Sequence, residues 1–438
     1  MNVDKHLSFS DQFSLWASLA VTLTIPAAAV FVVNPLGGKP LGTAAAVTAI
    51  VVGTVFGSFL LGGVALIGQR SARPTMAMLG GIVGARTSWL PTVLNIAQCI
   101  GWAGVEVLVM TEGATSLTSH AWRPFWAVVS GGFALLMALR PVRAIKALRK
   151  YLVALVVIAT VVLIVGLLQR GVHTADTGSW YGFWPAFDIV ISLPVSWAPL
   201  VADYSRHGRD ERGAFLGTAA GFASAGIVYF LMGLLAILTL NGAATASTAT
   251  QFIPALLAVP VGVVALIILL IDEVDDAFAN VHSTAVSIEN LTRRFSRTWI
   301  AVGIAIIAIA IALFTDLMAY ESFLYVIGAV FVPLTGVALT WVFAICRGRY
   351  SAERSTPWLL LPWAAGLVVY QLLAPGFAPG WSDLWNAARN ALGITTVTWS
   401  ASMTSLVVAA VGTLLVGAIS GRASGAVADE GQPSMTRI

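Results

Sequence analysis

Long apolar runs recur along the whole chain, and they constrain its fold more than any other feature. The run "LLAVPVGVVALIILL" at 256–270 is one of many. A helix needs about 20 apolar residues to cross the hydrocarbon core of a bilayer. Of the 438 residues, 58% are hydrophobic and only 10% are charged, whereas a soluble domain carries roughly a quarter charged residues. The sequence therefore predicts an all-α integral membrane protein without a separate soluble domain.

The apolar runs predict twelve transmembrane helices separated by short loops. Residues 1–11 form the N-terminus, and residues 419–438 form a small, polar tail. The expected spans are 12–34, 42–68, 89–113, 123–140, 151–169, 184–203, 213–240, 253–288, 298–315, 321–345, 357–374 and 394–418.

The basic residues of this arrangement are very unevenly distributed. Twenty of the 24 lysines and arginines fall on the side of the termini, and the opposite side holds only Lys39, Arg123, Arg170 and Arg389. Cytoplasmic loops carry an excess of basic residues, so we expect both termini in the cytoplasm and the chain in the inner (plasma) membrane. Basic and non-basic loops alternate along the chain, and a missed span would break this alternation, so the pattern also supports an even number of spans. The basic residues are thus topology determinants and do not predict nucleic-acid binding.

Two of the expected helices contain internal proline. Pro26 interrupts 12–34, and Pro194 and Pro199 interrupt 184–203. Proline removes a backbone donor and clashes with the preceding turn. Each proline alone fits a simple packing kink, but these two helices would each open a five-helix block. Interrupted helices at corresponding positions of two repeats point to a transporter binding site.

We therefore expect two inverted repeats of five helices each. The first repeat covers 12–169, the second covers 184–345, and two accessory helices cover 357–418.

A polar stripe follows one face of the span expected at 89–113. Gln98, Trp102 and Glu106 are four residues apart, so they stack on one side of a helix. Gly101 and Gly104 flank the indole and would admit another helix or a flat ligand. An ionised carboxylate inside a membrane is costly, so Glu106 should face the protein interior. The stripe lines a ligand site, or Glu106 simply bonds a neighbouring helix while Trp102 packs.

Four carboxylates crowd into "DEVDD" at 272–276. Asp272, Asp275, Asp276 and Asn280 share one helical face, and Glu273 sits to the side. In a helix that begins near Phe252, the cluster would lie about 20 residues in, towards the cytoplasmic half. It is then a solvated helix end or a region that couples to a cation or proton, since crowded carboxylates raise one another's proton affinity.

The cluster also has an enzymatic interpretation. "DEVDD" matches the aspartate-rich motifs with which membrane prenyltransferases hold magnesium diphosphate. Such enzymes need a second acidic motif, and the nearest match is the loop sequence "DYSRHGRDE" at 203–211. A channel or a receptor-like sensor is a further alternative. Neither class explains the paired interrupted helices together with the polar stripe.

In order and spacing, five motifs resemble the nucleobase–cation symporter family. They are "ARPTM" (72–76), "IGWAGVE" (100–106), "ADYSR" (202–206), "DDAFANVHSTAVSI" (275–288) and "ESFLYVIGAVFVPLTGV" (321–337). The resemblance covers nearly the whole chain. It implies a LeuT-type fold, transport by alternating access, and a flat substrate held between aromatic side chains of the third and sixth helices.

The resemblance also assigns candidate substrate residues. Trp102 takes the place of the third-helix aromatic, Glu106 the place of an amide that reads the ring edge, and Asn280 that of the eighth-helix asparagine. The sixth-helix aromatic position falls near Pro194, so Trp197 is the nearest candidate. Gln98 completes the expected substrate set. A carboxylate accepts from an amino group and a ring N–H together, which an edge of cytosine, a purine or an aminopyrimidine such as hydroxymethylpyrimidine presents.

Coupling residues follow less directly. In sodium-coupled relatives small hydroxyl residues of the eighth helix face the break of the first, and those positions fall near Val274 and Asp275 here. We expect Thr24, Asp272, Asp275 and Asp276 to bind sodium or a proton, with no prosthetic cofactor and a monomeric carrier. Asp203 and Arg206 form part of a cytoplasmic gate or a simple helix-end ion pair.

Overall fold

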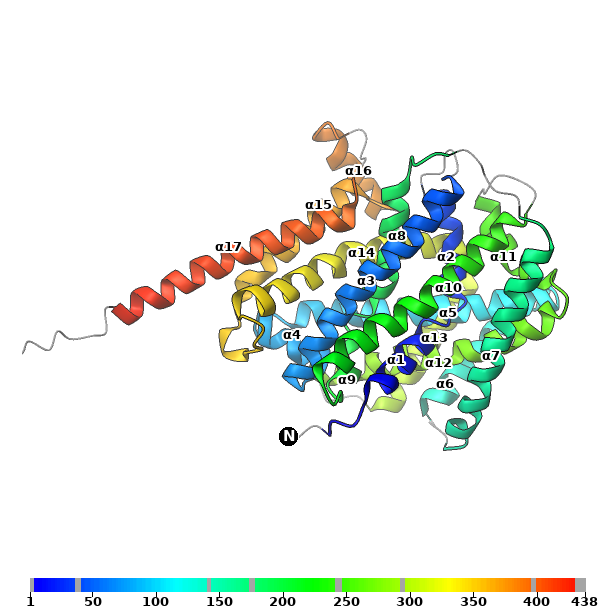
Figure 1. Ribbon diagram of the computed structural model, residues 1–438, viewed down its shortest axis with the longest axis horizontal. Helices are drawn as coiled ribbons and strands as arrows, with labels where there is room; N and C mark the ends of the chain where they lie inside the picture. The colour runs from blue at the N-terminus through cyan, green and yellow to red at the C-terminus, as the bar shows by residue number, and fades with distance from the viewer. Residues whose placement is uncertain are drawn as a thin grey trace, which may run out of the picture.

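The computed structural model describes residues 4–35, 41–139, 143–172, 178–240, 246–291, 296–394 and 399–429. Every regular element among them is a helix, apart from one bridge between Leu7 and Gly208. Figure 1 shows the helices packed side by side, with α17 (Ala401–Asp429) extending beyond the others. The all-α fold expected from the sequence is confirmed.

Nine helices in the described part are long and apolar enough to cross a membrane, and one bent pair makes up to ten. The carboxylate-rich α12 (Gly262–Leu291) and the shorter α15 (Leu360–Leu373) are further candidates. The count of twelve spans therefore stays a prediction. The other long helices are α3 (Thr43–Ser71), α5 (Trp89–Leu117), α6 (Arg123–Leu139), α7 (Arg143–Gln169), α10 (Thr218–Leu238), α13 (Arg297–Phe314) and α14 (Leu317–Leu339).

The first expected span is broken. It consists of α1 (Phe9–Leu19) and α2 (Thr24–Val33), which are bent by 63° relative to each other. Pro26 lies in the first turn of α2, where a missing N–H has no intrahelical partner to lose. Between the two helices, the N–H of Leu23 donates to a side chain of another helix, Glu273.

The sixth expected span is broken as well. It consists of α8 (Phe183–Ser196) and the short α9 (Val201–Ser205), with Pro199 in the turn between them. The interruptions predicted on the first and the sixth spans are thus present. Pro194 was expected to contribute to the second one, but it lies inside α8, and Phe183–Ser205 still counts as one membrane-crossing helix.

The eighth expected span, 253–288, is wrong at its start. The chain forms α11 (Ala246–Leu257), turns at Ala258–Val261, and begins α12 only at Gly262. Pro260 disfavours helical conformation in the residue before it and ends the first helix. The carboxylates at 272–276 are consequently the eleventh to fifteenth residues of a 30-residue helix. They lie near its middle and not about 20 residues in.

Several short helices connect the long ones. The last span was expected from residue 394, but α17 starts at Ala401. The short elements are α4 (Thr75–Val83), α16 (Trp381–Ala391), η1 (His120–Trp122), η2 (Gly213–Gly217), η3 (Thr340–Ile345), η4 (Ala352–Arg354) and η5 (Pro357–Leu359).

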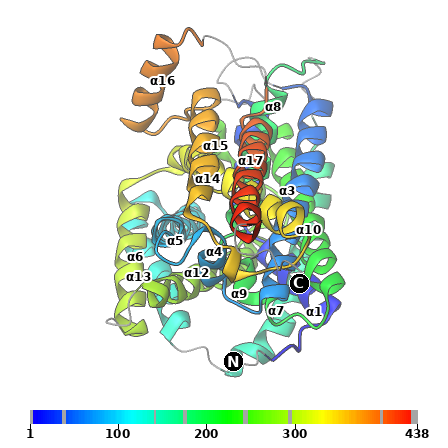
Figure 2. The same ribbon diagram turned by 90° about the vertical axis from the view of Figure 1, so that its left-hand side faces the viewer.

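The N-terminal segment and three loops lie together at one end of the molecule. Leu7 pairs with the loop after α9, through its N–H to His207 O at 2.9 Å and its carbonyl to Arg209 N at 2.8 Å. Arg70, at the end of α3, forms an ion pair with Glu211 at 2.6 Å and donates to Gly348 O after η3. This guanidinium holds the pKa of the Glu211 carboxyl below its usual range. Figure 2 places α16 at the opposite end from the N-terminus.

Candidate functional site

The expected polar stripe on α5 faces α12 in the interior. Glu106 is only 3% exposed and Asn280 only 1%. Asn280 Nδ2 donates to Glu106 Oε1 at 2.8 Å and to the Asp276 carbonyl at 3.2 Å. The structure thus brings together the two residues expected to read the substrate's edge.

Gln98 lies two turns away on the same face of α5. Its Nε2 donates to Ser196 O at 2.9 Å, a carbonyl at the end of α8, and to Asn95 Oδ1 at 3.0 Å. Asn95 in turn donates to Ser287 Oγ of α12 at 2.8 Å. The stripe therefore connects α5 to the broken sixth span and to α12.

Trp102 lies between these amide and carboxylate groups and contacts two rings of α14. Its ring centroid is 5.8 Å from that of Tyr320 and 5.3 Å from that of Phe323, both edge to face. A Cβ added at Gly101 would lie 2.5 Å from Phe323, and one at Gly104 would lie 2.5 Å from Ile311. The two glycines thus admit neighbouring helices at close range.

Four polar atoms, three on the α5 stripe and one on Asn280 of α12, are buried without a hydrogen-bond partner. Three are acceptors: Glu106 Oε2, Asn280 Oδ1 and Gln98 Oε1. The fourth is the indole donor, Trp102 Nε1. A buried polar group without a partner costs about 1–3 kcal/mol, so these four atoms are unfavourable where they lie unless other groups supply partners.

The break between α1 and α2 is closed by Glu273, which lies beside the expected polar face of residues 272–280. Thr22 Oγ1 donates to Glu273 Oε1 at 2.7 Å, and Leu23 N donates to Glu273 Oε2 at 2.8 Å. The hydroxyls of Thr22 and Thr24 are 2.9 Å apart. The carboxylate thus binds the N-terminal end of α2, where helix dipole and free N–H groups favour an anion.

Tyr320 joins this break to the aromatic cluster. Its hydroxyl donates to Thr24 O at 3.2 Å, while its ring packs against Trp102 and Phe31. Neither Tyr320 nor Phe323 was expected from the sequence, although "ESFLYVIG" begins at the residue after Tyr320.

The three carboxylates expected to couple transport to an ion are Asp272, Asp275 and Asp276. Asp272 is 8% exposed and lies on the wall of a cavity between α1, α7 and α10. Asp276 is 3% exposed. The side chain of Asp275 lies outside the described residues.

Trp197 lies at the end of α8 and faces α1. Its ring is 6.0 Å from that of Trp16, edge to face, and Trp16 makes the same kind of contact with Tyr204 of α9. Pro194 faces α3, where a Cβ at Gly57 would meet its ring. In this conformation Trp197 thus belongs to an aromatic group with Trp16 and Tyr204.

Asp203 and Arg206 have separate partners. Asp203 Oδ1 accepts from Thr75 N at 2.9 Å, at the start of α4, and Ala202 N donates to Thr75 Oγ1 at 3.0 Å. Arg206 Nε donates to His207 Nε2 at 3.1 Å. The ion pairs within 4.0 Å among the described residues do not include Asp203 with Arg206.

A further buried carboxylate was not singled out from the sequence. Asp188 on α8 accepts from Ser400 Oγ, from Ala401 N at 2.8 Å and from Ser402 N at 3.0 Å. It caps the start of α17, so this accessory helix is attached to the broken sixth span.

The broken first and sixth spans around a polar stripe define a class of protein, namely membrane carriers of the LeuT type. The fold matches Mhp1 in its inward-facing conformation, with a TM-score of 0.69 and 15% identity over 95% of this chain and 92% of that one. A second structure of Mhp1, a nucleobase-cation-symport-1 family transporter closed around bromovinylhydantoin, matches with the same score and identity over 95% of each chain. A sodium-coupled sialic acid symporter matches with a TM-score of 0.55 and 11% identity over 94% and 95%.

The sequence identifies the family. Residues 5–357 match the family model described as permease for cytosine/purines, uracil, thiamine, allantoin, and the chain belongs to this family. No curated protein matches the chain. Family membership makes the chain a transport protein and not an enzyme.

The prenyltransferase interpretation of "DEVDD" is therefore not supported. Within the described residues, His, Cys, Asp and Glu side chains form no group of three or more that could hold a metal ion. Glu273 of this motif is instead used to close the helix break.

Proposed function

We propose that this permease imports a planar, nucleobase-like heterocycle together with a cation or proton. One observation carries the proposal: three buried acceptor atoms, on Glu106, Asn280 and Gln98, have no donor. Glu106 and Gln98 share a face of α5 with Trp102, and Asn280 of α12 is hydrogen-bonded to Glu106. The substrate class is that of cytosine, a purine or hydroxymethylpyrimidine. The solved relative Mhp1 with bound bromovinylhydantoin supports a flat heterocyclic ligand in this fold.

The free acceptors select the ligand's edge. Glu106 Oε2 and Asn280 Oδ1 belong to two hydrogen-bonded side chains, so a ring edge with an amino group beside a ring N–H can donate to both. Hydrogen bonds to a charged group contribute about 1.5–3 kcal/mol. Stacking on the indole of Trp102 adds about 0.5–1.5 kcal/mol beyond the area buried.

Alternating access would open and close the site from each side in turn. An aromatic group of Trp16, Trp197 and Tyr204 packs between α1 and the break of the sixth span, on the side of the termini in the expected topology. We propose that this aromatic group closes the cytoplasmic path, with Asp203 and Arg206 beside it as part of the gate. Both termini then lie in the cytoplasm, the chain lies in the plasma membrane, and a single copy transports.

Equilibrium binding tests the substrate class without requiring transport. Ligands that bind the native state raise its melting temperature, so the purified protein in detergent is melted with cytosine, hypoxanthine, allantoin, hydantoin and hydroxymethylpyrimidine. The proposal expects a saturable rise with ligands that present adjacent donors. A panel in which none of the heterocycles changes the melting temperature would contradict it.

A further inference from the structure

We propose that the coupling ion is the proton and that Glu273 carries it, an inference that rests on the proposed transport function. Glu273 is 1% exposed, and each of its oxygens accepts one hydrogen bond from the break of the first span. It occupies the junction of α1, α2 and α12, where an ion could control the angle between the two halves of the broken helix.

The donors around Glu273 favour an anion over a metal cation. The N–H of Leu23 points at one oxygen and cannot turn away, because it belongs to the backbone at the start of α2. A sodium ion at this place would meet that N–H and the positive end of a helix dipole. A proton, in contrast, neutralises Glu273 without placing a further ion in the junction of α1, α2 and α12.

Two hydroxyls next to Glu273 allow the proton to be accommodated. When Glu273 is ionised, Thr22 donates to it. When Glu273 is protonated, its O–H can donate to Thr22, whose own hydroxyl then turns to Thr24 at 2.9 Å. Hydroxyl groups can both donate and accept, so the chain reverses without moving heavy atoms. When the Glu273 carboxylate loses its charge, its interaction with the N-terminal end of α2 weakens.

The surrounding titratable groups also favour proton uptake. Glu106 on α5, Tyr229 on α10 and Tyr320 on α14 face Glu273 from neighbouring helices. Asp272 and Asp276 lie on its own helix. Lysine and arginine contact neither Glu106 nor Glu273 within the part of the chain that is described. Two buried carboxylates without a cationic partner repel each other, and one proton relieves this.

A cavity lies next to this region. It has a volume of about 480 Å³ and is lined by the C-terminal half of α1, by the central parts of α7 and α10, and by Asp272 of α12. Ser14, Ser224, Tyr229 and Asp272 provide polar groups on its wall. The volume is large enough for several waters. Since Asp272 lines this cavity and precedes Glu273 on α12, we assign the cavity as the place from which a proton reaches Glu273.

The test compares exchange with accumulation in proteoliposomes that contain a pH-sensitive dye. Labelled cytosine is followed in counterflow, under a pH gradient and under a sodium gradient, for wild type, Glu273→Gln and Thr22→Val. Glu353→Gln, at an exposed position of η4, is the control. One pH unit corresponds to about 1.4 kcal/mol, or tenfold accumulation for one proton per substrate. We expect this in wild type and control, with acidification of the lumen.

In Glu273→Gln and Thr22→Val we expect counterflow to persist while pH-driven accumulation falls about tenfold per pH unit. Accumulation driven by sodium alone in wild type, or by pH in Glu273→Gln, would overturn the inference. Infrared titration of the protein adds an independent readout, because the band of a protonated carboxyl should vanish in Glu273→Gln. An unchanged band would also overturn it. Absence of counterflow in wild type would instead reject the proposed function, and the infrared result would still decide proton binding.

Discussion

The carboxylates of this protein differ in what they contact, and the contacts assign their roles. Glu106 keeps one buried oxygen without a hydrogen-bond partner, Glu273 closes a helix break, and Asp188 caps α17. Sequence spacing found the first of these because residues four apart share a helical face. It could not find the second, since Glu273 bonds to Thr22 and Leu23, which are about 250 residues away in sequence.

Glu106→Gln should change substrate preference more than protein abundance. The amide keeps the shape but replaces one acceptor by a donor, so a ligand that donates to Oε2 loses a charged hydrogen bond. A loss of about 1.5–3 kcal/mol corresponds to roughly 10- to 150-fold weaker binding. Thermal shift against each heterocycle measures this, with expression level as the control. An unchanged competition profile in both binding and uptake would refute the role of Glu106.

Ser400→Ala should loosen the attachment of α17. It removes the side-chain donor to Asp188 and leaves the two backbone donors in place. Loss of a helix cap costs about 1 kcal/mol, which a melting curve in detergent can detect. Thr404→Val is the matched control, since that hydroxyl bonds only within the helix, to Ser400 O. Equal melting temperatures for the two variants would argue against the cap.

At the scale of elements, proline predicted the interruptions of the first and sixth spans, whereas hydropathy hid the boundary between α11 and α12. The run from Phe252 to Leu270 is apolar throughout, so hydropathy joined α11 and α12 into one helix. Only the turn before Gly262 puts the carboxylates in mid-helix. Short polar helices such as α16 lack an apolar run altogether, and no span signal marks them.

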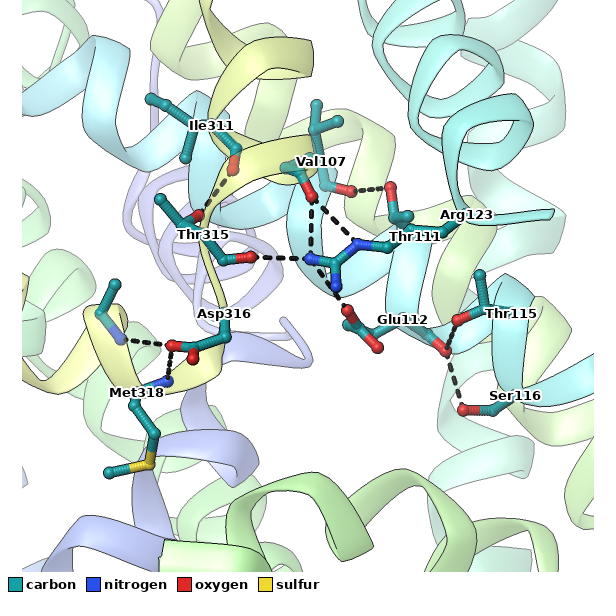
Figure 3. A network of polar contacts seen from close by, with 12 residues as sticks. Val107, Thr111, Glu112, Thr115, Ser116, Arg123, Ile311, Thr315, Asp316 and Met318 are labelled. Atoms are coloured by element: carbon teal, nitrogen blue, oxygen red, sulfur yellow. Dashed lines mark hydrogen bonds and ion pairs between the residues drawn. The ribbon is translucent and has the colours of Figure 1, made fainter. Parts of the chain in front are cut away.

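One arginine, Arg123 at the start of α6, bonds to both α5 and α13. Arg123 donates to Ala312 O at 2.9 Å and Thr315 O at 2.7 Å, and forms an ion pair with Glu112 at 3.2 Å (Figure 3). Charge asymmetry identified Arg123 as one of four basic residues on the side opposite the termini. It could not identify these three partners.

Arg123→Ala should lower thermal stability by about 2 kcal/mol, because two carbonyls lose a charged donor. Arg123→Lys should recover only part of this, since an ammonium lacks the planar fork that reaches both carbonyls. Arg86→Ala, at an exposed position, serves as the control in the same melting experiment. Full recovery by lysine would show that charge alone matters at this site.

For the whole molecule, the alternation of charge predicted that the N-terminal segment and the loops after α3, α9 and η3 lie on the same side of the membrane. In the structure these segments bond to one another at one end. Composition and motif order were enough for the fold class and the family. Residue spacing could not give the contacts of Glu273 with Thr22 and Leu23, on which the proposed coupling ion depends.

Accumulation of radiolabelled cytosine in proteoliposomes, with imposed pH and sodium gradients and unlabelled competitors, tests the central claim most directly. The account predicts saturable uptake driven by an ion gradient and suppressed by heterocycles that offer adjacent donors. Uptake that neither gradient drives and no heterocycle suppresses would contradict it.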